Sequence, residues 1–161
     1  MRQLLIGCGN SRSLSGIEVG ELVTVDIDPN CGADVLHDLN VLPYPFRDES
    51  FDQIHAYEVL EHCGTQGDWR FFFGQFQEFW RVLKPGGILI ASVPIGPWVW
   101  GDPGHTRTIQ LESLVFLSQA EYQKQVGKTH MTDYRHVWKG DFELVAHEVT
   151  DKLTFILKAI K

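Results

Sequence analysis

The carboxylates of Asp26 and Asp28 follow a short β-branched segment, residues 23–25. An ionised carboxylate only accepts hydrogen bonds, so at the tip of a strand it can hold both hydroxyls of a ribose. Asp28 would point the same way along the strand, but it precedes Pro29 and suits the cap of a turn better. We therefore expect Asp26 to be the ribose ligand.

A glycine turn follows the first apolar run of the chain. Gly7 and Gly9 flank Cys8 directly after residues 4–6, and glycine lets the chain turn sharply while a ligand approaches the backbone. A dinucleotide-binding fingerprint requires a third glycine at position 12, where this chain has Arg12. Nicotinamide or flavin dinucleotides are therefore disfavoured, and a plain turn between a strand and a helix is the alternative reading.

Protic side chains occur in a Pro/Gly-rich loop, residues 94–110, whose length suggests a functional role. His105 is the leading catalytic candidate, because an imidazole ordinarily titrates near neutrality and can take a proton from a hydroxyl or an amine. Asp102 and Arg107 are candidate substrate contacts. The alternative is a turn in which Asp102 bonds its own backbone and the histidine is structural.

The apolar periodicity predicts the elements that position these side chains. A helix is predicted to begin after Asp68, a residue type that often caps helices. Its aromatic residues recur at the spacing of one buried helix face up to Leu83, and Pro85-Gly86-Gly87 then ends it. A base-stacking role for these aromatic residues is the weaker alternative. Shorter helices are expected within residues 10–21 and 110–119. The predicted strands are 4–6, 23–27, 33–37, 51–57 and 88–93, followed by an antiparallel hairpin of 142–149 and 153–160.

Four segments carry a resemblance to a known family: LLIGCGN, TVDIDP, SFDQIHAYEVLEH and RVLKPGG. In this order and at these spacings, they resemble class I S-adenosylmethionine-dependent methyltransferases of the small bacterial and phage type, similar to methyltransferase domain 11. The resemblance covers Leu4 to about Pro94. It implies an α/β, Rossmann-like, doubly wound sheet of seven strands in the order 3-2-1-4-5-7-6, with the last strand antiparallel and the helices shortened.

The same resemblance implies the cofactor S-adenosyl-L-methionine, with S-adenosyl-L-homocysteine as product. In the family, the carboxylate at Asp38 accepts from the adenine amino group and the backbone N–H of Leu39 meets the ring; an Asx turn before Asn40 is the alternative. The Glu61-His62 pair, tempting as an acid/base or metal pair, mainly shapes a loop in the family. The implied cofactor-binding residues are Gly7, Cys8, Gly9, Asp26, Ile27, Asp38, Leu39 and Tyr57.

The predicted reaction is methyl transfer to an oxygen or nitrogen of a small molecule or sugar by in-line displacement, which needs alignment and exclusion of water and no metal. The motifs of DNA amino and cytosine-ring methylation are missing. One alternative is a module that binds S-adenosylmethionine without catalysis and partners another subunit, motivated by Ser11 and Leu5, where the family usually has glycine and often an acidic residue. A protein methyltransferase and a nucleotide-binding oxidoreductase are further alternatives.

Length and composition set the remaining expectations. The 161 residues, 43% of them hydrophobic, suit a single domain over 1–161. Cys8, Cys31 and Cys63 fit neither a disulfide set nor a zinc motif. Net charges of −9 over residues 1–80 and +2 over residues 81–161 disfavour a nucleic-acid partner. With no membrane-length apolar run and an apolar segment directly after Met1, a cytoplasmic protein is expected, and nothing in the residues sets an oligomeric state.

Overall fold

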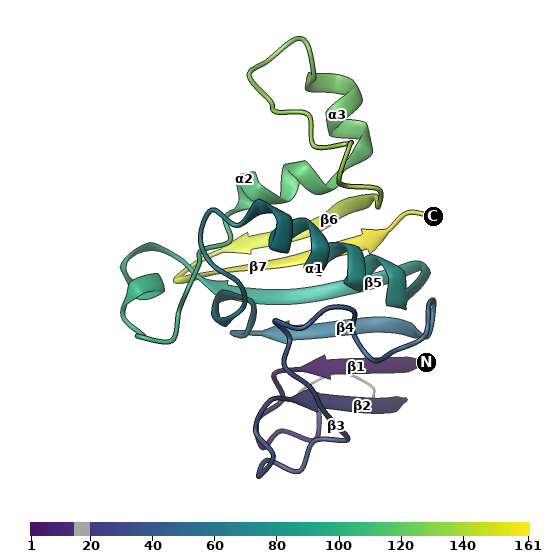
Figure 1. Cartoon of the computed structure of the whole chain (residues 1–161), viewed down its shortest axis with the longest axis vertical. Helices are drawn as coiled ribbons and strands as arrows, with labels where there is room; N and C mark the ends of the chain where they lie inside the picture. The colour runs from purple at the N-terminus through teal and green to yellow at the C-terminus, as the bar shows by residue number, and fades with distance from the viewer. Residues whose placement is uncertain (15–19) are drawn as a thin grey trace.

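A seven-stranded sheet in the order β3-β2-β1-β4-β5-β7-β6 forms the centre of the molecule (Figure 1). The computed structural model describes residues 1–14 and 20–161. Strands β1 to β5 pair in parallel, whereas β7 is antiparallel to both β5 and β6, so the predicted order and direction are confirmed. The strands are β1 Arg2–Ile6, β2 Glu21–Asp26, β3 Val35–Leu36, β4 Phe51–Tyr57, β5 Leu83–Pro94, β6 Phe142–Val149 and β7 Lys152–Ala159.

The link from β2 to β3 holds no helix. Asp34 folds back onto β2, where its Oδ2 accepts from the backbone N of Thr24 at 2.8 Å and from the Thr24 hydroxyl at 2.7 Å. The Thr24 hydroxyl in turn accepts from the backbone N of Asp34 at 3.0 Å. These bonds hold a two-residue third strand at the edge of the sheet, as the short loop predicts.

Helix α1, Trp69–Val82, packs on one face of the sheet. Its N-cap is Asp68, whose side chain accepts from the backbone N of Phe71, and its buried face includes Phe73, Phe76 and Phe79. The predicted cap and the predicted core role of the aromatic residues are therefore confirmed. The strand after the helix is longer than predicted, because pairing with β4 already begins at Leu83, ahead of the glycines.

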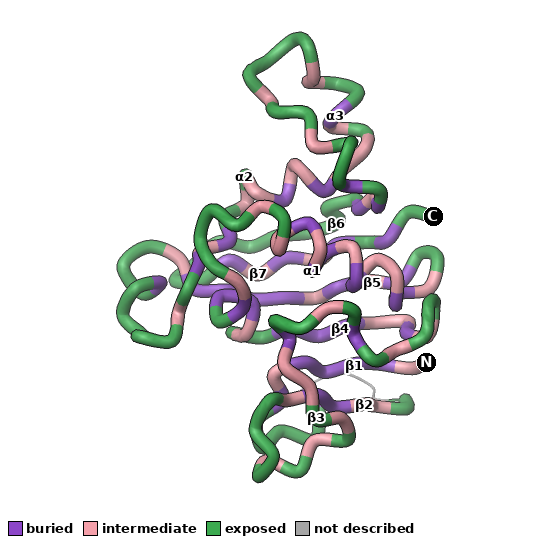
Figure 2. The backbone as a smooth tube through the Cα atoms, viewed as in Figure 1, coloured by how far each residue is buried: buried purple, intermediate pink, exposed green. Residues whose placement is uncertain are grey.

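The segment between β5 and β6 holds only short helices, η2 Gly96–Trp100, α2 Leu111–Leu114, η3 Val115–Leu117 and α3 Gln119–Gln125. The prediction of one helix over 110–119 is wrong, since Ser118 is extended and caps α3 by accepting from the backbone N of Glu121. Around α3 the chain extends beyond the sheet and is mostly exposed (Figure 2). The predicted hairpin of β6 and β7 is confirmed.

The two faces of the sheet are buried differently. The main hydrophobic core gathers Ile54 and Ala56 of β4 with α1, η3 and α3. In Figure 1, α1 lies across the sheet, while α2 and α3 lie beyond its β6 end. A smaller cluster on Leu5 of β1 includes Cys8 and Leu14. The expected helix within residues 10–21 falls largely on residues 15–19, outside the described residues. None of the helices that the structure describes is both long and apolar enough to cross a membrane.

Candidate functional site

Two cavities lie at the carboxyl ends of the central strands and share Gly7. The first has a volume of about 350 Å³, and its lining includes Gly7, Asp26, Ile27, Asp38 and Leu39. The second, of about 560 Å³, is lined by Leu5, Gly7, Cys8, Ser11, Ser13, Leu14 and Tyr57. The structure thus brings together all of the predicted cofactor-binding residues except Gly9 along one crevice, which we call the Gly7 crevice.

Asp26 fixes the glycine turn from the neighbouring strand. Its Oδ2 accepts from the backbone N of Gly9 at 2.7 Å, and its Oδ1 accepts from the backbone N of Asp28 at 2.9 Å. Gly9 lines neither cavity but is tied to the crevice by this bond. Each carboxylate oxygen can accept a further hydrogen bond, so Asp26 can still receive two hydroxyls. Asp28 caps the following turn by accepting from the backbone N of Asn30 at 2.8 Å, as the sequence predicts.

Asp38 makes the Asx turn that the sequence left as an alternative. Its Oδ1 accepts from the backbone N and the side-chain amide of Asn40, both at 2.9 Å. Among the described residues, no hydrogen bond engages Oδ2, which leaves that oxygen for an amino group of a ligand. Asn40 in turn accepts from the backbone N of Gly64 at 2.7 Å and so joins the two loops that flank the first cavity.

Arg12 closes the glycine turn where a dinucleotide fingerprint would need a third glycine. Its guanidinium donates to the carbonyl oxygens of Gly9, at 2.9 Å, and of Ser11 and Cys31. Burial raises the pKa of the Cys8 thiol, so this side chain lines the second cavity as a neutral group. Arg12 therefore takes part in the turn itself, and the expectation that dinucleotides are disfavoured stays a prediction.

Gly7 is confined by the loop that follows β4. It has φ +61°, and a Cβ built there would lie 2.3 Å from a methyl carbon of Val59. The glycine is therefore required both by its backbone conformation and by a close approach to a neighbouring segment. At Gly9, with φ +48°, an added Cβ would have no heavy atom of the described residues within 4 Å, so only the backbone conformation favours glycine.

Three protic side chains meet at the rim of the Gly7 crevice, and we call them the Glu61 cluster: Glu61, His62 and His105. Glu61 and His62 belong to η1, Leu60–His62, which directly follows β4, and His62 also lines the first cavity. His105 Nε2 lies 3.8 Å from Glu61 Oε1 and 3.9 Å from Asp102 Oδ2. Burial, with a contribution from the charge of Glu58, raises the pKa of Glu61 to about 7.

Asp102 and Arg107, the predicted substrate contacts, differ in exposure. Asp102 is exposed and its Oδ1 accepts from the backbone N of Gly104 at 2.7 Å, as in the turn that the sequence left open. Arg107 is 4% exposed, donates from Nε to the carbonyl oxygen of Leu60 at 2.8 Å and bonds the side chain of Gln75. The contacts of Arg107 therefore hold η1 in place from its buried side.

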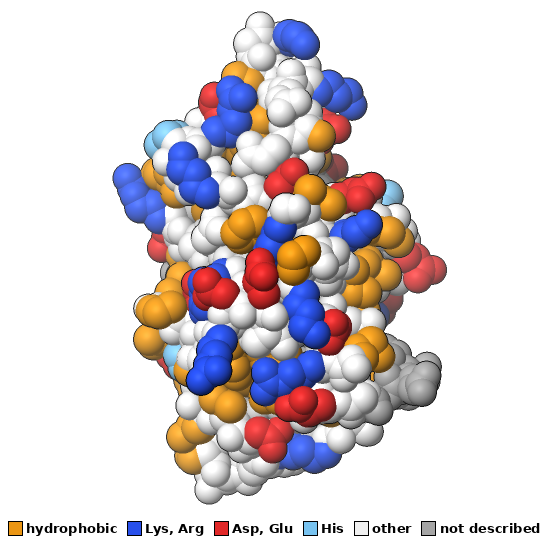
Figure 3. Space-filling model, turned by 90° about the vertical axis from the view of Figure 1, so that its right-hand side faces the viewer, with side chains coloured by type: hydrophobic (Ala, Val, Ile, Leu, Met, Phe, Trp, Pro, Cys, Tyr) orange, Lys and Arg blue, Asp and Glu red, His pale blue; other side chains and the backbone are white. Residues whose placement is uncertain are grey.

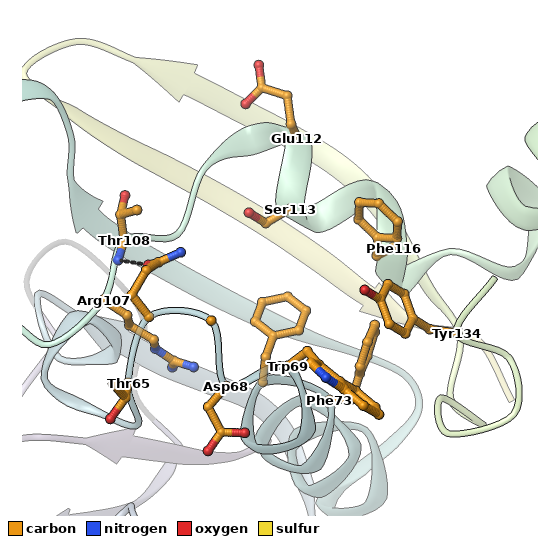
Figure 4. Close-up of a pocket in the computed structure, with 13 residues that line it drawn as sticks. Thr65, Asp68, Trp69, Phe73, Arg107, Thr108, Glu112, Ser113, Phe116 and Tyr134 are labelled. Atoms are coloured by element: carbon orange, nitrogen blue, oxygen red, sulfur yellow. Dashed lines mark hydrogen bonds between the residues drawn. The ribbon is translucent and has the colours of Figure 1, made fainter. Parts of the chain in front are cut away.

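Arg107 also lines a third cavity, of about 310 Å³ (Figure 4). Trp69 and Phe73 of α1 contribute aromatic walls, and Phe116 and Tyr134 face them from the second half of the chain, with ring centroids 5.8 Å apart. Sequence reasoning assigned these rings of α1 to the core and did not find the cavity. No single segment of the sequence indicates this cavity, because residues far apart in the chain form its walls.

Comparisons with known proteins find similar sequences and similar folds. A family model described as "Methyltransferase domain" matches residues 4–91, more than half of the chain. The human protein named "Probable tRNA methyltransferase 9B" is 35% identical over 97 residues, which are 55% of this chain and 20% of that protein. The chain therefore matches only a fifth of the length of this relative.

Solved structures share the fold. An S-adenosylmethionine-dependent methyltransferase from Archaeoglobus fulgidus aligns with a TM-score of 0.60 and 17% identity, over 98% of this chain and 85% of that chain. The N-methyltransferase NodS from Bradyrhizobium japonicum, in complex with S-adenosyl-L-homocysteine, aligns with a TM-score of 0.58 and 14% identity, over 99% and 78%. At these identities the likeness shows the fold alone.

Proposed function

The chain belongs to the methyltransferase domain family, and from that membership we propose that it transfers the methyl group of S-adenosylmethionine to a small-molecule acceptor. The observation that carries the proposal is the pair of cavities that meet at Gly7. Asp26 and Asp38 line the first cavity and supply acceptors for ribose hydroxyls and an adenine amino group. The second cavity, beyond Gly7, offers room for the methionine part.

The reaction asks little of the protein beyond alignment. A sulfonium is already an activated leaving group, so the chain has to hold the acceptor atom, methyl carbon and sulfur in line and exclude water. Tyr57 and Glu58 lie at the end of β4 beside the two cavities, and the Glu61 cluster lies next to them. In this proposal His105 Nε2 accepts the proton of the acceptor, and Asp102, which is exposed at 3.9 Å from it, contacts the acceptor.

The third cavity supports a small acceptor with an apolar or aromatic body. Its aromatic walls can bury a ring, and Arg107 provides charge at one side. A nucleic-acid acceptor, as in the name of the human relative, is the second candidate. The net charge of −7 weighs against it, and on the face in Figure 3 basic and acidic side chains are interspersed rather than gathered by sign.

Titration of S-adenosylhomocysteine tests the cofactor site. Asp26→Asn removes the charge while keeping an acceptor for the turn, and it should weaken binding by about 1.5 to 3 kcal/mol, or roughly 10- to 150-fold. Asp28→Asn is the matched control, because Asp28 is exposed and only caps the next turn. Equal losses in both variants would refute the ribose assignment of Asp26.

Transfer from a labelled methyl donor then tests the acceptor. A metabolite panel, a protein extract and bulk tRNA serve as parallel acceptors, and label should enter the metabolite panel. Label in tRNA or protein would replace the small-molecule proposal. Tight binding of S-adenosylhomocysteine without any transfer would favour the module without catalysis.

A further inference from the structure

The Glu61 cluster has the composition of a metal site. One ligand atom from each of Glu61, His62 and His105 lies within 4.8 Å of the other two. The rings of His62 and His105 meet edge to face, with centroids 4.5 Å apart and planes at 79°. Two separate segments thus direct one carboxylate and two imidazoles to the same place.

The Glu61 side chain is buried without the hydrogen bonds that usually accompany a buried carboxyl group. It is 1% exposed, and neither carboxylate oxygen has a hydrogen-bond partner among the residues that the structure describes. Within the cluster, Nε2 of His105 lies 3.8 Å from Oε1 of Glu61, beyond hydrogen-bond distance. A buried carboxyl group without a partner is costly, so this arrangement points to a ligand that binds between these side chains.

The two histidines are oriented as metal ligands usually are. His62 Nδ1 lies 3.1 Å from the carbonyl oxygen of Gly104, and His105 Nδ1 lies 2.6 Å from the carbonyl oxygen of Val99. A carbonyl oxygen only accepts, so Nδ1 carries the hydrogen in each ring and the lone pair of the neutral imidazole falls on Nε2. A hydrogen bond from the second ring nitrogen to a carbonyl typically fixes a metal-ligating histidine.

The separations within the cluster also suit a shared ion. Ligands bound at about 2.0 to 2.2 Å around a tetrahedral ion lie about 3 to 3.5 Å from each other. The gap of 3.8 Å between His105 and Glu61 is too long for a hydrogen bond and closes to that range with a small rotation of either side chain.

We propose that Glu61, His62 and His105 bind one divalent transition-metal ion of the Zn²⁺ type, with a further coordination position open to solvent or acceptor. Two imidazoles and one carboxylate form a donor set of this class, whereas Mg²⁺ and Ca²⁺ prefer oxygen ligands alone. The site differs from the expectation, drawn from the sequence, that the chain needs no metal.

A role in catalysis follows only if the proposed function holds. His62 also lines the first cavity, so the ion would lie at the rim where an acceptor enters. A hydroxyl bound to the open position would have its pKa lowered and would lose its proton to solvent. The resulting alkoxide oxygen would form the new bond to the methyl carbon as the bond from that carbon to sulfur breaks and S-adenosylhomocysteine leaves. In that case His105 acts as a ligand, and the metal replaces it in activating the acceptor.

Direct binding of Zn²⁺ to the full chain, stripped of metal by a chelator, tests the proposal. Calorimetric titration against a competing chelator should show one ion per chain with an affinity on the order of micromolar or tighter. Glu61→Gln and His62→Asn should each weaken binding at least about 100-fold, as expected for the loss of one ligand of three. His130→Asn is the control, since His130 is exposed and outside the cluster, and should bind as the parent does.

Two further readouts separate a lost ligand from a damaged fold. Glu61→Gln should unfold at the same temperature as the metal-free parent or higher, because it removes a buried charge. His62→Asn should unfold close to the metal-free parent, because His62 is exposed. Co²⁺ added to the parent should give the visible absorption of a low-coordinate site, which both variants should lose.

Unchanged Zn²⁺ affinity in both variants would overturn the proposal. So would binding that is lost in Cys31→Ser, because Cys8, Asp26 and Cys31 form the other possible metal cluster among the described residues. A chain that binds S-adenosylhomocysteine but no Zn²⁺ refutes this inference and leaves the proposed function standing. The reverse result refutes the proposed function and keeps the metal site.

Discussion

The two faces of β4 differ, because one carries apolar side chains and the other carries hydrogen-bonded polar side chains. Ile54 and Ala56 point into the apolar core beneath α1. On the other face, Gln53, His55 and Tyr57 form a hydrogen-bonded line in which His55 lies 3.1 Å from Gln53 and 2.9 Å from Tyr57. His55 is completely buried although it is polar.

The difference shows how a central parallel strand can be built without two apolar faces. Such strands are usually apolar on both sides, because helices cover both. Here the polar face is satisfied internally: Gln53 Oε1 accepts from Gln3 at 2.9 Å and from His55 Nε2, which leaves His55 Nδ1 to accept from the Tyr57 hydroxyl. Stability on this face therefore depends on protonation and hydrogen bonding, and on the α1 face it depends on packed volume.

The strongest test of the packed face is Phe76→Ala. Phe76 is fully buried on the core-facing side of α1, so the cavity and the lost contacts should cost about 3 to 5 kcal/mol of unfolding free energy, measured by urea denaturation. Arg70→Ala, at an exposed position of the same helix, should cost less than about 1 kcal/mol. A small loss for Phe76→Ala would show that this face does not rely on volume.

The polar face should respond to pH. Burial lowers the pKa of His55 from 6.5 to about 4, so between these values the unfolded chain binds a proton that the folded chain does not. The contribution of His55 to stability is full above its unfolded pKa and should fall by up to about 3 kcal/mol as the pH drops to the folded value. His55→Gln keeps hydrogen-bonding capacity and should remove this part of the decline. Parallel pH curves for parent and variant would contradict the assignment.

The smallest effect is expected for Tyr57→Phe. The change removes the hydroxyl that donates to His55 and should cost about 1 kcal/mol at neutral pH, because a buried acceptor loses its partner. Repeating the substitution in the His55→Gln background gives a double-mutant cycle. Complete additivity would mean that the hydroxyl and the imidazole do not act together.

The sequence predicted some features of the molecule directly and left others open. The Asp68 cap, the helical spacing of apolar residues and the turn at residues 150–152 act locally, so α1 and the final hairpin could be inferred from the residues, whereas the sheet order was implied by the family resemblance. The broken helices near Ser118 could not, since Ser118 both ends one short turn and begins the next. The sequence singled out the Glu61-His62 pair and His105 separately but not their meeting, because His105 reaches Glu61 only after the loop from β5 has folded against η1.

One contact makes Gly7 more than a place where a ligand can approach. A Cβ at residue 7 would lie 2.3 Å from a methyl carbon of Val59, the residue directly before the helical turn that carries Glu61 and His62. A larger residue there would displace Val59 and with it the turn that carries Glu61 and His62, and it would add volume where the two cavities meet. A single substitution at residue 7 would therefore disturb both the Gly7 crevice and the position of the Glu61 cluster.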